Sequence, residues 1–77
     1  AMTNMIQRRS SMADAYWRQL GLAAPARRAL LAHHCHTLAD VCQHRRTAVA
    51  EWHGIGPNAL AILDAALQAA GLGFAGE

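Results

Sequence analysis

Two apolar stretches of helical periodicity flank the short segment Gly54-Ile55-Gly56-Pro57. Glycine reaches backbone conformations that other residues avoid, and it lets the chain approach another molecule closely. Proline begins a helix well, because the first helical N–H group has no partner in any case. The segment therefore predicts a tight turn between two helices, with Ile55 directed into the core. The N–H groups that open the second helix carry a partial positive charge, which suits a phosphate group.

The rest of the chain also has the pattern of short helices. Alanine occupies 18 of the 77 positions while β-branched and aromatic residues are sparse, which favours helices over strands. Apolar spacing and capping residues predict five helices, over residues 11–20, 25–34, 38–43, 46–52 and 57–70. Ser11 with Asp14 resembles a capping box, and Thr37 is a suitable N-cap. We expect an all-α fold, a compact bundle of about five short helices.

Three parts are expected along the chain. Residues 1–10 are polar and aperiodic and predict an N-terminal arm, residues 11–20 an extra helix, and residues 21–77 the main domain. No apolar run reaches the ~20 residues that span a bilayer, and the N-terminal residues lack the apolar core of a signal peptide. We therefore expect a cytoplasmic protein without a membrane partner, in which the two cysteines stay reduced.

Four segments occur in an order that is known from one family of domains. They are Leu22-Ala23-Ala24-Pro25, Thr37-Leu38-Ala39-Asp40-Val41, Trp52-His53-Gly54-Ile55-Gly56-Pro57 and Ala69-Ala70-Gly71-Leu72-Gly73-Phe74. In this order, residues 22–74 resemble the helix-hairpin-helix fold, which is SAM-like, and within it the C-terminal domain of the bacterial RNA polymerase alpha subunit. The resemblance implies a small bacterial transcription protein that contacts DNA phosphates and the minor groove with the starts of two helices.

Position by position, the resemblance carries over only part of the family's DNA-binding residues. The hairpin glycine matches Gly56, whose amide would face a phosphate. The arginine that enters the minor groove falls on Pro25, and a nearby asparagine falls on Arg28. The lysine and serine that open the last helix fall on Asn58 and Ala59. The resemblance thus implies a phosphate grip with little reading of sequence.

The leading hypothesis is a non-enzymatic DNA-binding module with weak, largely sequence-independent contacts to the duplex phosphate backbone. All seven basic residues are arginines, whose planar guanidinium pairs well with phosphate, although the net charge is only +2. Paired arginines also occur on ordinary solvated surfaces. The candidate DNA-binding residues are Gly54, Gly56, Asn58, Arg28 and Arg27.

The alternative is a protein-interaction or dimerisation module of transcription that does not bind DNA. Pro25 in place of the family's arginine and the low net charge favour it. Met12, Tyr16 and Trp17 form an apolar group outside the region of resemblance, and such a group must pack on the domain or on a second copy. A homodimer through these three residues is the corresponding prediction.

We expect no enzymatic activity, cofactor or small-molecule substrate. The acidic residues are scattered, and neither a P-loop nor a dinucleotide-binding glycine pattern occurs. The histidines and cysteines of residues 33–53 suggest a metal-responsive element, but four adjacent residues cannot face one ion and no Cys-x-x-Cys pair exists. We interpret Cys35 and Cys42 as small buried hydrophobes, and the histidines as groups that add positive charge on acidification.

Overall fold

The computed structural model describes the backbone of residues 2–76 and the side chains of residues 11–76. Within this part the chain forms no strand and five helices, α1 (Met2–Gln19), α2 (Ala24–Ala32), α3 (Leu38–Val41), α4 (Arg46–Ala50) and α5 (Pro57–Ala69). The all-α class expected from the sequence is confirmed. The last four helices begin at or next to their predicted first residues. Proline marks the starts of α2 and α5, and Thr37 marks that of α3.

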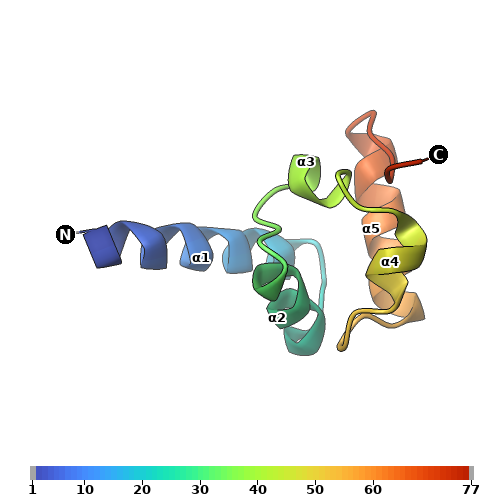
Figure 1. Ribbon diagram of the computed structural model, residues 1–77. Coiled ribbons are helices and arrows are strands. Elements are labelled where there is room, and N and C mark those ends of the chain that lie inside the picture. Colours follow the sequence, from blue (N-terminus) through green and yellow to red (C-terminus); the bar gives the residue numbers. More distant parts are fainter. Residues whose placement is uncertain (1, 77) are drawn as a thin grey trace.

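The first helix is longer than the sequence predicted. It begins at Met2 rather than at Ser11, so an N-terminal arm over residues 1–10 is not observed within the described backbone. Residues 2–10 contain neither glycine nor proline, and a helix that is already packed extends easily through such a segment. Figure 1 shows the N-terminal half of α1 extending away from the other helices. Ser11 therefore lies inside the helix and does not cap it.

Trp17 of α1 is a central residue of the core. Its side chain is 0 % exposed, and its indole Nε1 donates a hydrogen bond to the Cys35 carbonyl oxygen at 3.0 Å. A buried indole requires such an acceptor, since its N–H group has left water. Residues 11–20 thus share one core with the rest of the chain. Trp17 is not available for the dimer contact that the sequence suggested.

The four-residue helix α3 is held by a capping box. Thr37 Oγ1 accepts a hydrogen bond from the Asp40 N–H at 3.2 Å, which confirms Thr37 as the N-cap. The Asp40 carboxylate accepts hydrogen bonds from the N–H groups of His36 at 2.9 Å and Thr37 at 3.1 Å. These donors, the one of His36 first, lower the pKa of Asp40. The Asp40 carboxylate therefore serves to cap α3.

Helix α5 supplies the opposite wall of the core. Leu63 and Leu67 are buried on it, and Phe74 folds back after the helix as predicted, whereas Leu72 remains 40 % exposed. Ile55 is buried beneath the turn between α4 and α5, also as predicted. The other buried apolar residues are Ala13, Leu22, Ala26, Ala29, Leu30, Cys35, Val41, Val49, Ala59 and Leu60.

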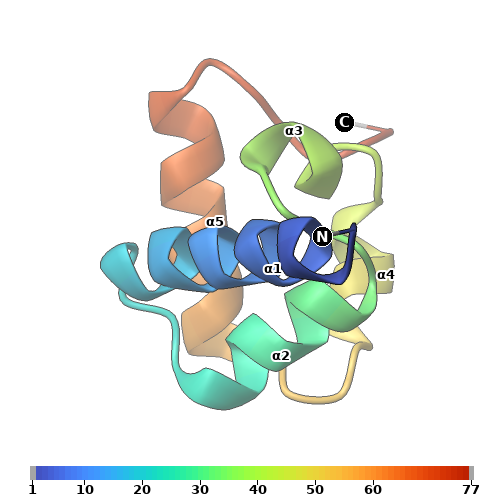
Figure 2. The ribbon, with the colours of Figure 1, turned by 90° about the vertical axis from the view of Figure 1, so that its left-hand side faces the viewer.

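One end of the molecule gathers the segments that the sequence singled out. The first turn of α2, the α4–α5 turn (residues 51–56) and the first turn of α5 lie together there in both Figure 1 and Figure 2. Segments far apart in the sequence thus form one surface. None of the helices described in residues 2–76 combines the length and hydropathy that crossing a bilayer requires.

Candidate nucleic-acid interface

Gly54 fits the α4–α5 turn tightly against helix α2. Its φ angle is +99°, a conformation that a side chain makes costly. A β-carbon at this position would also overlap the backbone carbonyl group of Pro25 in the first turn of α2. Both constraints arise inside the fold. Glycine at position 54 is therefore explained by architecture alone.

Gly56, two residues later, is under neither constraint. Its backbone is extended, with φ −112° and ψ −175°, which any residue adopts. No described atom lies within 4 Å of the place where its β-carbon would stand. Gly56 is the N-cap of α5, yet it has no side chain to accept a helix N–H group. Serine, aspartate or asparagine would cap the helix better. Neither the backbone conformation nor a close neighbour in the described fold therefore requires glycine here, although N-cap positions favour glycine over most apolar residues.

The start of α5 has unused hydrogen-bond donors. The N–H groups of Gly56 and Asn58 have no hydrogen-bond acceptor within residues 2–76, and Asn58 is exposed. Pro57 between them has no N–H group. These donors add to the positive end of the helix dipole. The local chemistry therefore suits an anion that approaches along the glycine.

A shallow hollow of about 570 Å³, the turn hollow, lies between the starts of α2 and α5. Gly54, Gly56 and Asn58 are among its lining residues, together with apolar residues such as Pro25 and Ile62. No charged side chain is among the residues that line it. Three of the five predicted DNA-binding residues are thus brought together, but without a cationic side chain among them.

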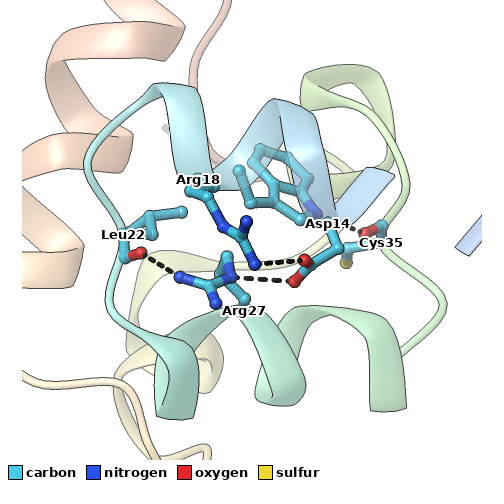
Figure 3. Close-up of polar contacts among 6 residues, drawn as sticks. Asp14, Arg18, Leu22, Arg27 and Cys35 are labelled. Carbon is cyan, nitrogen blue, oxygen red and sulfur yellow. Dashed lines mark hydrogen bonds and ion pairs between the residues drawn. The ribbon is translucent and has the colours of Figure 1, made fainter. Parts of the chain in front are cut away.

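Arg27 is not a free DNA-binding residue, contrary to the prediction. Its Nε donates to Asp14 Oδ1 at 2.8 Å, another guanidinium nitrogen donates to the Leu22 carbonyl at 2.8 Å, and the side chain is only 15 % exposed. Figure 3 shows Arg27 and Arg18 meeting at the Asp14 carboxylate. Arg27 therefore fastens α1 to the start of α2. Asp14, for which we expected a capping role, is the acceptor instead.

Arg28 has the opposite environment. It is exposed and has no hydrogen bond or ion pair within the part of the chain that the structure describes. It lines a second hollow, the arginine hollow, whose lining residues are Pro25, Arg28, Ala29, Ala32, His33 and His53. Pro25 is common to both hollows, so Arg28 lies on the surface that continues from the turn hollow.

The sequence did not assign His33 and His53 to this interface. The His33 ring stacks on the indole of Trp52, with ring centroids 3.8 Å apart and planes 4° apart. His53 lies in the α4–α5 turn and is exposed. Both were grouped with neighbouring cysteines and histidines as metal candidates, because spacing along the chain does not reveal which rings share a hollow.

The apolar group on α1 is divided by the fold. Met12 is 72 % exposed and Tyr16 is half-buried, and both line a small hollow with His36 and Thr37. Trp17 lies in the core and contributes nothing to that surface. The homodimer proposed from these residues would therefore rest on Met12 and Tyr16 alone.

The cysteines and histidines form no metal-binding cluster among the described residues. No group of three or more histidine, cysteine, aspartate or glutamate side chains there is placed to hold a metal ion. Cys35 is buried, as expected, and burial raises its pKa to about 11, with the negative charge of Asp40 as a smaller cause. Such a thiol is a poor nucleophile near neutral pH. Cys42 is only partly buried.

Comparison with known proteins gives no relative for this chain. No protein-family model, no curated protein and no solved structure matches it.

Proposed function

We propose that this chain is a DNA-binding module of the helix-hairpin-helix type, which holds the phosphate backbone of a duplex at the start of α5. The observation that carries the proposal is Gly56. No backbone or steric constraint of the described fold requires it to be glycine, it stands beside unpaired N–H donors, and its missing side chain leaves the backbone open to a ligand. Close approach of a phosphate oxygen would account for a glycine at this position.

The expected contacts are few. The N–H groups of Gly56 and Asn58 and the amide side chain of Asn58 would face one phosphate, and Arg28 would face a neighbouring one across Pro25. Two such phosphate contacts give weak binding, with log affinity falling against log salt at a slope of about −1.8. Pro25 donates no hydrogen bond to a base edge, so little sequence preference is expected.

A second function, binding of an apolar protein segment, is favoured by one observation. The turn hollow is lined by proline, alanine, leucine and isoleucine and by no charged side chain. An apolar peptide would gain from covering it, whereas a phosphate gains only from the backbone donors. Both functions would involve Gly56 and Asn58, but only the DNA function involves Arg28 and weakens with salt, so a duplex titration separates them.

The test is a titration of ¹⁵N-labelled protein with a short mixed-sequence duplex at low salt, followed by amide chemical shifts. We expect the largest changes at Gly56, Asn58 and Arg28, and reversal on addition of salt. Gly56→Glu should abolish these changes, because it places a carboxylate where the phosphate would approach. Its matched control is Gly56→Gln, which has the same size without the charge and should retain weaker binding.

Absence of shifts at low salt would contradict the DNA proposal, as would shifts spread evenly over the chain. Concentration-dependent changes at Met12 and Tyr16 without DNA would instead support self-association through α1.

A further inference from the structure

We propose that Arg28, His33 and His53 form a pH-gated site for a phosphate group in the arginine hollow. The three side chains come from two separate segments, the helix α2 with the residue after it and the α4–α5 turn, and they line one hollow of about 460 Å³. The other lining residues, Pro25, Ala29 and Ala32, carry no charge. The chemistry of this hollow is thus set by one guanidinium and two imidazoles.

The positive charge of such a site depends on pH. Arginine is charged throughout the physiological range, whereas histidine ordinarily changes its charge between pH 5 and 8. Protonation of either imidazole would therefore add positive charge beside Arg28 in this hollow. A protonated imidazole also donates from both ring nitrogens, which matches the several acceptor oxygens of a phosphate.

His33 is held in place by Trp52. The two rings are stacked at 3.8 Å, and the ring of His44 meets the same indole edge-on at 4.9 Å and 79°. The stack fixes the plane of the His33 ring at the end of α2, next to the hollow that it lines. Protonated His33 keeps Trp52 as a partner, because an indole face attracts a cation. The ring is therefore positioned in both charge states.

No carboxylate among the described residues competes for this site. From α2 the neighbouring charged group is Arg28, from the α4–α5 turn His53, and from the segment between α3 and α4 His44. Glu51, at the end of α4, makes no ion pair with any described residue and does not line the hollow. The remaining described carboxylates are Asp14, paired with Arg18 and Arg27, Asp40, which caps α3, and Asp64, paired with Arg46.

The phosphate site extends the proposed function. It rests on that function in one respect, which is that the phosphate comes from a DNA duplex. The arginine hollow adjoins the turn hollow at Pro25, so one phosphate at Gly56 and the next at Arg28 could belong to the same strand. Acidification would then strengthen duplex binding at the second position alone. A free phosphate ion would meet the same three side chains.

The test has two arms, both at constant ionic strength. In the first, duplex binding is measured by anisotropy at pH 8.0 and at pH 5.8. The imidazoles would contact the same phosphate as Arg28, so we expect affinity to rise roughly tenfold on acidification while the salt slope changes by less than about 0.9. The variant His33→Gln/His53→Gln should remove this rise. His34→Asn removes an exposed histidine outside the hollow, at a positive φ that asparagine tolerates, and should retain the rise.

In the second arm, inorganic phosphate is titrated at pH 5.8 while the imidazole resonances of all histidines are followed. We expect His33 and His53 to shift together and His34 to stay unchanged. If phosphate shifts both rings but no duplex binds, the site stands and the proposed function fails. If duplex binds equally at both pH values and phosphate leaves both rings unchanged, the site is overturned and the proposed function stands.

Loss of the stack on Trp52 could disturb the fold in the double variant, so His53→Gln alone is the second variant. His53 is exposed and makes no hydrogen bond or ring contact among the described residues. The variant His53→Gln should therefore leave the circular dichroism spectrum unchanged and still reduce the pH-dependent rise in duplex affinity by about half. An unreduced rise would contradict the assignment of His53 to the site.

Discussion

Two neighbouring pairs of residues at the same end of the molecule have opposite environments. Gly54 and Arg27 form an inner seam, in which a turn and an arginine are fixed against the start of α2. Gly56 and Arg28 belong to an open face, on which neither residue is under a steric demand. Neither the Gly56 N–H group nor the Arg28 guanidinium has a hydrogen-bond partner among the described residues. Residue type alone therefore does not separate architecture from binding. The contacts that each residue makes in the fold distinguish a structural residue from a candidate binding residue.

The largest expected difference between seam and face concerns the two glycines. Gly54→Ala should lower the free energy of unfolding by about 3 kcal/mol, because a side chain there combines a left-handed backbone with overlap of a carbonyl that cannot move away. Gly56→Ala should lower it by no more than about 1 kcal/mol, because alanine is a poorer N-cap than glycine but meets no steric or backbone conflict there. Urea unfolding followed by circular dichroism measures both. Equal effects would show that the distinction between the two glycines is wrong.

The two arginines give a smaller difference of the same kind. Arg27→Met should cost about 1–2 kcal/mol of stability, since the Asp14 carboxylate and the Leu22 carbonyl lose a charged donor. Arg28→Met should cost less than about 0.5 kcal/mol. Thermal unfolding of the two variants side by side is the measurement. A stability loss in Arg28→Met as large as that in Arg27→Met would place Arg28 in the seam.

Acid should affect the fold and the open face in separate pH ranges. The folded state lowers the pKa of Asp40, so its capping interaction is fully present above the ordinary carboxyl pKa of 3.8 and is lost as the pH falls through the lower, folded value. Histidines change charge well above that range. Between pH 7 and pH 5 we therefore expect stronger phosphate binding with an unchanged contribution from Asp40. Asp40→Asn should lower stability by about 1 kcal/mol at pH 7 and by less at pH 3.

The smallest expected effect is a difference in thiol reactivity between the two cysteines. It compares a buried residue with a partly exposed one in another part of the molecule. Cys35 is buried and has a pKa of about 11, so at pH 8 its reactive thiolate is scarce, whereas the thiol of Cys42 is partly exposed. A thiol reagent should label Cys42 quickly and Cys35 only after unfolding. Rapid labelling of Cys35 in Cys42→Ser would indicate that this part of the core opens.

Local signals in the sequence predicted most of the helices but few of the long-range contacts. Proline, glycine and Thr37 mark helix ends through neighbouring residues, and those ends are confirmed. The ion pair of Arg27 with Asp14 depends on how α1 crosses α2, which no local pattern encodes. One hint was present, because an arginine in the first turn of a helix opposes the dipole and so calls for a partner. The helical conformation of residues 2–10 was not predicted, because these residues lack an apolar stripe.

The candidate site was predicted only in part, because the sequence shows local neighbours but not long-range contacts. Gly54, Gly56 and Asn58 are close in sequence and therefore close in space. His33 and His53 meet Arg28 only because α2 and the α4–α5 turn are packed together. Single-residue chemistry suggested a metal for these rings, whereas their common hollow suggests an anion.

The salt dependence of duplex binding tests the central claim most directly, which is that the open face holds phosphate. Affinity is measured from low to moderate salt for the wild type, for Arg28→Gln, and for Arg18→Gln as a control on the exposed side of α1. We predict a wild-type slope of about −1.8, a slope shallower by about 0.9 for Arg28→Gln, and no change for Arg18→Gln. No binding at low salt, or the same slope for Arg28→Gln as for the wild type, would contradict the account.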